Sequence, residues 1–247
     1  HIKEAYGFDL NPLAVLIAKV KTTPIKTEDL GKALNRILGA TKHNGVPNFK
    51  NIDFWFKPNV TEKLAILKTA INKIQDENIK DFFSVVFSET VRNVSNTRNG
   101  EFKLYRMSKE SLSRHNPQVF REFERIASRN IIGMQKYTKA KQKSQTKAQL
   151  GNSMLELPLK PRSINLVVTS PPYGDSRTTV AYGQFSRLAL QWLGYEDINS
   201  LDNKLLGGKA TKELKVKINS PTLKKIVEKI ALKDQKRARE VLSFYED

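Results

Sequence analysis

Apolar residues recur at three- and four-residue intervals through most of residues 10–137, which is the spacing of one face of a helix. The first such run follows an Asn-Pro pair at residues 11 and 12, where Asn can cap a helix and Pro fits its first turn. The same spacing predicts further helices over residues 27–40, 60–75, 78–95 and 117–137. Turn-rich segments at 41–51 and 95–106 separate them, so we expect a long, mainly helical stretch.

Two short segments show a strand pattern instead. Residues 5–9 predict a strand that ends at Asp9, just before the first helix. A largely β-branched run predicts a buried parallel strand and comprises Ile164, Leu166, Val167 and Val168. Ligands bind at the carboxyl ends of the strands in such α/β sheets, so the residues that follow each strand are candidates for a site.

The second strand leads into Ser170-Pro171-Pro172-Tyr173, which we name the SPPY loop. Its prolines fix the backbone and lack N–H donors, so the carbonyls there are free to accept hydrogen bonds. A hydroxyl and an aromatic ring stand beside them. Such a loop suits a flat ring that bears an amino group, although an ordinary loop after a core strand could carry the same letters.

This loop resembles the catalytic loop of the S-adenosylmethionine-dependent amino-methyltransferases. The Ser-Pro-Pro-Tyr form is similar to that of DNA methyltransferases acting on N4 of cytosine, whereas Asp-Pro-Pro-Tyr is more typical of those acting on N6 of adenine. Segments 88–106 and 174–194 also resemble a subgroup of bacterial restriction–modification methyltransferases. The resemblance implies an α/β fold: a partial Rossmann-like methyltransferase sheet, a large mainly helical insertion and a basic helical C-terminal part.

By this resemblance the SPPY loop is catalytic, with the target base flipped out of the duplex, and the cofactor is S-adenosylmethionine. Asp9 would hold the cofactor's ribose, with Asn11 beside it. Asn152 takes the place of an acid that contacts the adenine amino group in related enzymes. The alternatives are a plain helix cap for Asp9 and a turn residue without a ligand for Asn152.

The formal net charge of +18 indicates a polyanionic partner. Within segment 88–106, Arg and Asn side chains of the kind that read base edges are candidates to contact DNA. Arg177 and a lysine-rich stretch at 134–149, expected to be an exposed loop or frayed helix, are candidates to contact phosphates. The predicted DNA-binding residues are Arg92, Asn96, Arg98, Arg177, Lys139, Lys141 and Lys143. The alternatives are ordinary solvated helix faces and, for segment 88–106, a polar loop that packs against the catalytic domain.

We expect four parts: a cofactor-side strand and helix (1–25), a helical insertion with a possible role in target recognition (26–150), core strands with the SPPY loop (151–195) and a basic helical region (196–247). Members of the family carry a glycine-rich loop before the acidic residue, and none precedes Asp9 here. We therefore expect the chain to be an internal fragment of a larger enzyme. Such a fragment would be inactive on its own if the strands of the sheet that it lacks are essential.

The expected activity is methylation of cytosine N4 in duplex DNA, in a monomeric cytoplasmic enzyme with a cognate restriction endonuclease as a further partner. The alternatives are an N6-adenine DNA methyltransferase, an RNA amino-methyltransferase and a non-catalytic basic nucleic-acid-binding domain. The chain has no cysteine, which excludes disulfides and weighs against a carbon-5 methyltransferase, and its three scattered histidines predict no metal site. No apolar run is long enough to predict a membrane span.

Overall fold

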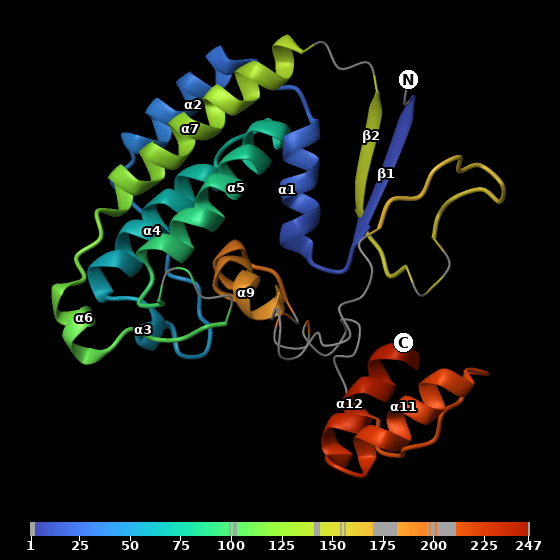
Figure 1. Ribbon diagram of the computed structural model, residues 1–247. Helices are drawn as coiled ribbons and strands as arrows, with labels where there is room; N and C mark the ends of the chain where they lie inside the picture. Colours follow the sequence, from blue (N-terminus) through green and yellow to red (C-terminus); the bar gives the residue numbers. More distant parts are fainter. Residues whose placement is uncertain are drawn as a thin grey trace.

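The computed structural model describes residues 3–98, 100, 103–140, 144–153, 155, 157–169, 182–196, 198, 201 and 211–246. Figure 1 shows a helical body, a small sheet beside α1 and a helical hairpin at the C-terminal end. The α/β class and the mainly helical insertion are as predicted. The Rossmann-like detail and the four-part division remain predictions.

The helical body consists of α1 to α7 together with α9, and most of its helices start and end close to the predicted positions. Its elements are α1 Pro12–Thr22, α2 Thr27–Leu38, α3 Ile52–Trp55, α4 Pro58–Asn72, α5 Glu77–Val94, α6 Lys109–Arg114, α7 Val119–Lys139 and α9 Tyr182–Leu193. Side-chain caps explain several starts: Asn11 accepts from the Leu13 N–H, Asp76 caps α5 and Ser108 caps α6. The short α3 and α6 lie in or beside segments that were predicted only as turns.

The core of the body contains a group of fully buried aromatic side chains among its aliphatic residues. Phe82, Phe83 and Phe87 of α5 are at most 1% exposed, and Phe123 of α7 is 0% exposed. Trp192 of α9 packs edge-on against three phenylalanine rings with centroid distances of 5.6–6.2 Å. Trp192 therefore packs α9 into the core of the body.

The sheet has two parallel strands among the described residues, β1 Glu4–Asp9 and β2 Gln145–Leu150. Their register runs from Glu4 opposite Gln145 to Asp9 opposite Leu150. Parallel neighbours need a long crossover, and here α1 to α7 supply it, with α1 packed on the sheet (Figure 1). The hydrophobic pattern did not predict β2, because QTKAQL is almost entirely polar. Most of the described residues of segment 134–149, expected to be an exposed loop or frayed helix, thus belong to the end of α7 and to this strand.

The prediction of a buried strand at 164–168 is wrong for this structure. These residues pair with no strand in the described part of the chain. Leu166, Val167 and Val168 are 72%, 76% and 86% exposed. A parallel strand forms only where a neighbour supplies its hydrogen bonds, and the two described strands pair only with each other.

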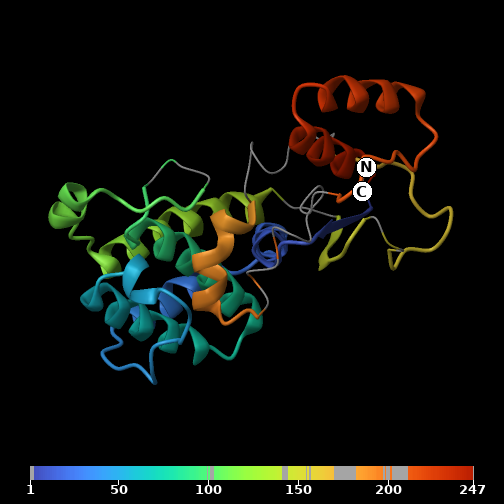
Figure 2. The same cartoon turned by 90° about the horizontal axis from the view of Figure 1, so that it is seen from below.

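The C-terminal end forms a basic helical hairpin of α11 Pro221–Ala231 and α12 Gln235–Glu246. It has a small core of its own, made of Leu223, Val227, Ala238 and Leu242. Figures 1 and 2 both show it apart from the helical body. Residues 221–231 and 235–246 are thus helical, whereas the extent of the basic region predicted over 196–247 remains a prediction. None of the described helices is long and apolar enough to cross a membrane.

Candidate functional site at the sheet edge

The carboxyl ends of β1 and β2 form one edge of the sheet, which we name the sheet edge. Asp9 and Leu150 are in register as the last residues of their strands. The Gly151 N–H donates to the Asp9 carbonyl oxygen at 3.1 Å, which extends the pairing by one residue. Asn152 comes next, so two of the three predicted cofactor-binding residues follow the same edge.

Asp9 is exposed at this edge and has one carboxylate oxygen in use. Its Oδ1 accepts from the Asn11 backbone N–H at 2.7 Å. The second oxygen, Oδ2, accepts no hydrogen bond from any other described residue. A carboxylate oxygen in this position can accept from a hydroxyl of a bound molecule.

Asn11 is nearly buried, and both ends of its amide have partners within the chain. The Oδ1 accepts from the Leu13 N–H at 3.0 Å, and the Nδ2 donates to the Ser186 hydroxyl of α9 at 3.1 Å. Asn11 therefore caps α1 and ties it to α9. The structure gives it a positioning role, whereas the sequence had suggested a direct contact with the cofactor.

Gly151 lies against the side chain of Phe8, which leaves no room for a side chain at this position. A Cβ at this position would lie 2.8 Å from the Phe8 ring, which is closer than real Cβ atoms come to a ring carbon. The turn continues with the Asn152 carbonyl accepting from the Leu155 N–H at 3.0 Å. The half-buried Asn152 side chain is thus presented on a turn whose path depends on glycine.

The SPPY loop and Arg177 lie outside the described residues. The helix α9, which follows them in the sequence, is held by contacts on two sides. Ser186 in its second turn contacts Asn11 of the cofactor-side segment. On the other side, the Leu104 N–H donates to Gln184 Oε1 at 3.3 Å, and Arg92 donates to the Phe185 carbonyl at 3.2 Å. The start of α9 therefore joins the sheet edge to segment 88–106.

Arg92 was predicted to contact DNA, and it lies half-buried against α9. Its guanidinium carbon stands 4.3 Å from the centroid of the Phe185 ring, a cation–π distance. Burial lowers the pKa of Arg92 from its usual value, and the group remains charged near neutral pH. Arg92 thus holds α9 in place, in agreement with the alternative that this segment packs against the catalytic part.

Asn96 also follows that alternative. Its side chain is 2% exposed and donates to the Phe54 carbonyl at 3.2 Å. Backbone bonds to Trp55 and Met107 fix the residue further. A side chain so enclosed does not reach a base edge, and the expected DNA contact by Asn96 is replaced by a structural role.

Arg98 and Lys139 keep exposed positions. The Arg98 N–H donates to the Tyr105 carbonyl at 2.8 Å, and its guanidinium lies 5.9 Å from that ring. Lys139 is the last residue of α7. Lys141 and Lys143 lie outside the described residues. No cluster of three or more potential metal ligands occurs among the residues that the structure describes.

Ser186 is the site residue that the sequence did not reveal. It is 1% exposed and accepts from Asn11, which is 175 residues away in sequence. The available signal was its place one turn before Leu190 on the buried face of α9. A serine on an otherwise apolar face needs a hydrogen-bond partner, but the pattern could not say which residue supplies it.

Comparison with known proteins identifies a relative along the whole chain. The type II methyltransferase M.MvaI of Kocuria varians is 44% identical over 281 residues, which cover 100% of this chain. The chain spans 61% of the length of that relative. No protein-family model matches the chain, and no solved structure matches it. The methyltransferase resemblance of the SPPY loop is thereby confirmed at the level of the family. The chain belongs to the same family as this type II methyltransferase.

Proposed function

We propose that the protein transfers a methyl group from S-adenosylmethionine to the exocyclic N4 of cytosine in duplex DNA, within a restriction–modification system. One observation carries this proposal: the Ser-Pro-Pro-Tyr sequence at residues 170–173 occurs in a chain that is 44% identical to a type II methyltransferase along its whole length. The cytosine preference rests on the serine in the first position of that loop.

The sheet edge fits the proposed cofactor. Asp9 offers a carboxylate oxygen that no described residue occupies, which suits ribose hydroxyls. Asn152 offers an amide oxygen, which suits the amino group of adenine. When bound, S-adenosylmethionine supplies a methyl group on a positively charged sulfur. Asp9 and Asn152 would hold the nucleoside part, and Asn11 would hold α1 and α9 in the arrangement that leaves Asp9 exposed.

The SPPY loop would hold the target base. An exocyclic amino group is unreachable inside the base stack, so the cytosine must be flipped out. Tyr173 would stack on the flipped ring. Ser170 and the Pro171 carbonyl would accept hydrogen bonds from the amino group and localise the lone pair on its nitrogen. This nitrogen would bond to the methyl carbon as the sulfur–methyl bond breaks and leaves its electron pair on a neutral sulfur, and the nitrogen would release one proton to solvent. The rate gain comes mainly from positioning.

Exposed basic residues would bind the duplex. Arg98 extends from segment 88–106, which is attached to the start of α9. Lys139, with Lys141, Lys143 and Arg177, would neutralise phosphates and make binding dependent on salt.

Three other activities compete with this one. N6-adenine methylation would use the same loop, because a serine can accept from either amino group. An RNA amino-methyltransferase would share the chemistry on another substrate. A non-catalytic DNA-binding domain would bind duplexes without any response to S-adenosylmethionine.

The test is mass spectrometry of nucleosides from methylation-deficient cells that express the full-length protein. We expect N4-methylcytosine with the wild type and none with the matched variant Ser170→Ala/Tyr173→Ala. N6-methyladenine would keep the mechanism and change the base. Unmodified DNA with either protein, or methylation that survives the double substitution, would reject the assignment of the SPPY loop.

A further inference from the structure

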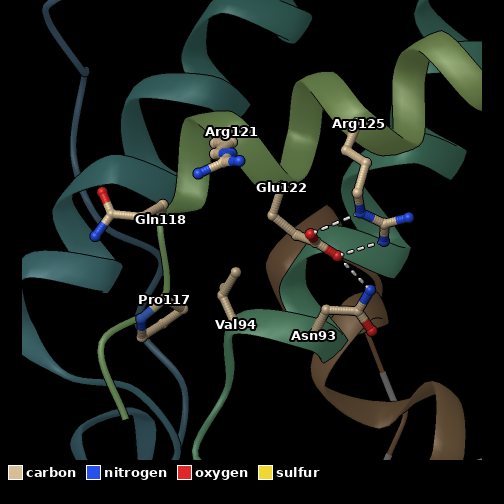
Figure 3. Close-up of a pocket in the computed structure, with 7 residues that line it drawn as sticks. All are labelled: Asn93, Val94, Pro117, Gln118, Arg121, Glu122 and Arg125. Carbon is tan, nitrogen blue, oxygen red and sulfur yellow. Dashed lines mark hydrogen bonds and ion pairs between the residues drawn. The ribbon is translucent and has the colours of Figure 1, made fainter. Parts of the chain in front are cut away.

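A cavity of about 560 Å³ lies where the end of α5 meets the start of α7. Figure 3 shows its lining: Asn93 and Val94 of α5, Pro117 and Gln118 before α7, and Arg121, Glu122 and Arg125 of α7. It has the volume of a small-molecule site. None of its lining residues belongs to the sheet edge, and Asn93 is one of the side chains of segment 88–106 that were candidates to contact DNA.

One wall of the cavity is electrically neutral. The Glu122 carboxylate accepts from Arg125 Nε at 2.9 Å and from a terminal Arg125 nitrogen at 2.7 Å, and from Asn93 Nδ2 at 2.7 Å. The bond to Arg125 is the main reason that the pKa of Glu122 lies below its usual value. Glu122 is therefore ionised at neutral pH and compensates the charge of Arg125.

The opposite wall carries a positive charge that is not compensated. Arg121 is exposed, and its guanidinium makes no hydrogen bond or ion pair with any other described residue. The Gln118 side chain is likewise without a partner among the described residues. The lining as a whole thus has one net positive charge, with a guanidinium and an amide available as donors.

The remaining lining, Val94 and Pro117, is apolar. Val94 belongs to segment 88–106, which also carries Arg98. Val94 and Pro117 lie on the side of the cavity away from Arg125 (Figure 3), and Val94 is 1% exposed. Arg98 follows Val94 by four residues and is exposed. A ligand with an anionic group and a less polar body, such as a sugar–phosphate unit, matches these surroundings.

We propose that this cavity binds a phosphodiester of duplex DNA, with Arg121 and Gln118 on the phosphate and Pro117 against the adjoining sugar. This inference rests on the proposed function, since it takes duplex DNA as the substrate. Phosphate contacts fix the register of a protein on a duplex, and base contacts specify the sequence. Anchoring the backbone beside Val94 would place neighbouring bases near Arg98.

The test compares the affinity of full-length variants for a fluorescent duplex of mixed sequence, measured by anisotropy over a range of salt concentrations. For Arg121→Gln we expect about tenfold weaker binding at low salt. The slope of log K against log salt should become shallower by about 0.9, the value for one phosphate contact. The separate variant Gln118→Glu should also weaken binding relative to the wild type, because it places a negative charge in the cavity.

Lys73→Gln provides the matched control. It removes one positive charge from an exposed residue at the end of α4, whose ammonium group makes no hydrogen bond or ion pair with any other described residue. Lys73 lies shortly before the start of α5, whereas the cavity residues Asn93 and Val94 lie at the far end of this 18-residue helix, about 27 Å from its start. We expect Lys73→Gln to bind like the wild type. Equal effects of Arg121→Gln and Lys73→Gln would reject the cavity while leaving the proposed function intact, whereas a wild type that fails to bind or methylate DNA would reject the proposed function itself.

Discussion

The helical body buries its apolar residues, whereas the sheet region leaves several of them exposed. By sheet region we mean β1, β2 and the described residues of 151–169. In the body, Leu64, Phe83, Phe87 and Phe123 are all 0% exposed. In the sheet region, Leu166, Val167 and Val168 are 72–86% exposed, and Leu150 at the end of β2 is 59% exposed. The body thus completes its core within the described residues, whereas the sheet region does not.

The candidate chemistry lies in the less buried of these two regions. Asp9 and Asn152 follow β1 and β2, and the SPPY loop follows the exposed 164–168 segment. The body contributes to the site through Arg92 and Leu104, which hold the start of α9. We infer a division in which the body supplies stability and the sheet edge supplies binding groups, and the predictions below test it.

The largest expected effect is that of emptying the body's core. Phe87 is 0% exposed and its ring lies 6.1 Å from that of Trp192. Phe87→Ala removes buried surface and leaves a cavity, so we expect the free energy of unfolding to fall by about 3–5 kcal/mol. Urea denaturation followed by circular dichroism measures this change.

Val168→Ser is the contrasting substitution in the sheet region. Val168 is 86% exposed, so the change should alter the free energy of unfolding by no more than about 0.5 kcal/mol. A loss of several kcal/mol for this variant would mean that the residue is buried in the folded protein, and the contrast between the two regions would collapse.

The next prediction concerns the affinity for the cofactor rather than the stability of the fold. Asp9→Ala removes the proposed acceptor for ribose hydroxyls, and hydrogen bonds to a charged group are worth about 1.5–3 kcal/mol. We expect the affinity for S-adenosylmethionine, measured by calorimetry, to fall about 10- to 100-fold. Asp9→Asn keeps an acceptor for the Asn11 N–H and should lose less. Unchanged cofactor affinity in Asp9→Ala would remove the sheet edge as the cofactor site.

The same contrast explains how far the sequence could predict the fold. The amphipathic spacing of the body placed its long helices well, because each of them buries its apolar face within the chain. β2 was missed because QTKAQL has only two apolar residues, Ala148 and Leu150, and it is a strand because β1 pairs with it. The 164–168 run has the composition of a strand but no described partner.

The prediction of the site residues succeeded and failed for similar reasons. Asp9 and Asn152 were predicted from the family motif together with the position of residues after strands, and both lie at the sheet edge. Asn96 and Arg92 were chosen for their chemistry alone, and chemistry does not reveal burial: Asn96 bonds to a carbonyl 42 residues away, and Arg92 to one that is 93 away. Such long-range partners are properties of the packed chain and are not visible in a local pattern.

A third prediction tests whether the sheet edge is as well defined as the core. Gly151→Ala places a Cβ 2.8 Å from the Phe8 ring, so we expect a loss of about 1–3 kcal/mol in the free energy of unfolding, with weaker cofactor binding. Gly7→Ala is the matched control on β1, where a Cβ meets nothing within 4 Å. Equal stability of the two variants would show that the turn after β2 is loosely packed.

The smallest expected effect lies in the body and depends on pH. Hydrogen bonds from Arg125 and Asn93 hold the pKa of Glu122 below its usual value of 4.5. A carboxyl group with a lowered pKa in the folded state stabilises the fold above the unfolded value, and this contribution disappears as the pH falls through the folded pKa.

At pH 7 we expect Glu122→Gln to lower the free energy of unfolding by about 0.5–1 kcal/mol, a modest figure because the pair is partly exposed. The difference from the wild type should shrink as the pH falls below 4.5, the usual value of this group. Glu110→Gln is the control, since the Glu110 and Arg114 side chains are 80% and 74% exposed and should contribute little. If the two variants show the same dependence on pH, the Glu122 network adds nothing beyond an ordinary surface ion pair. The buried apolar core would then remain the main source of the stability of the body.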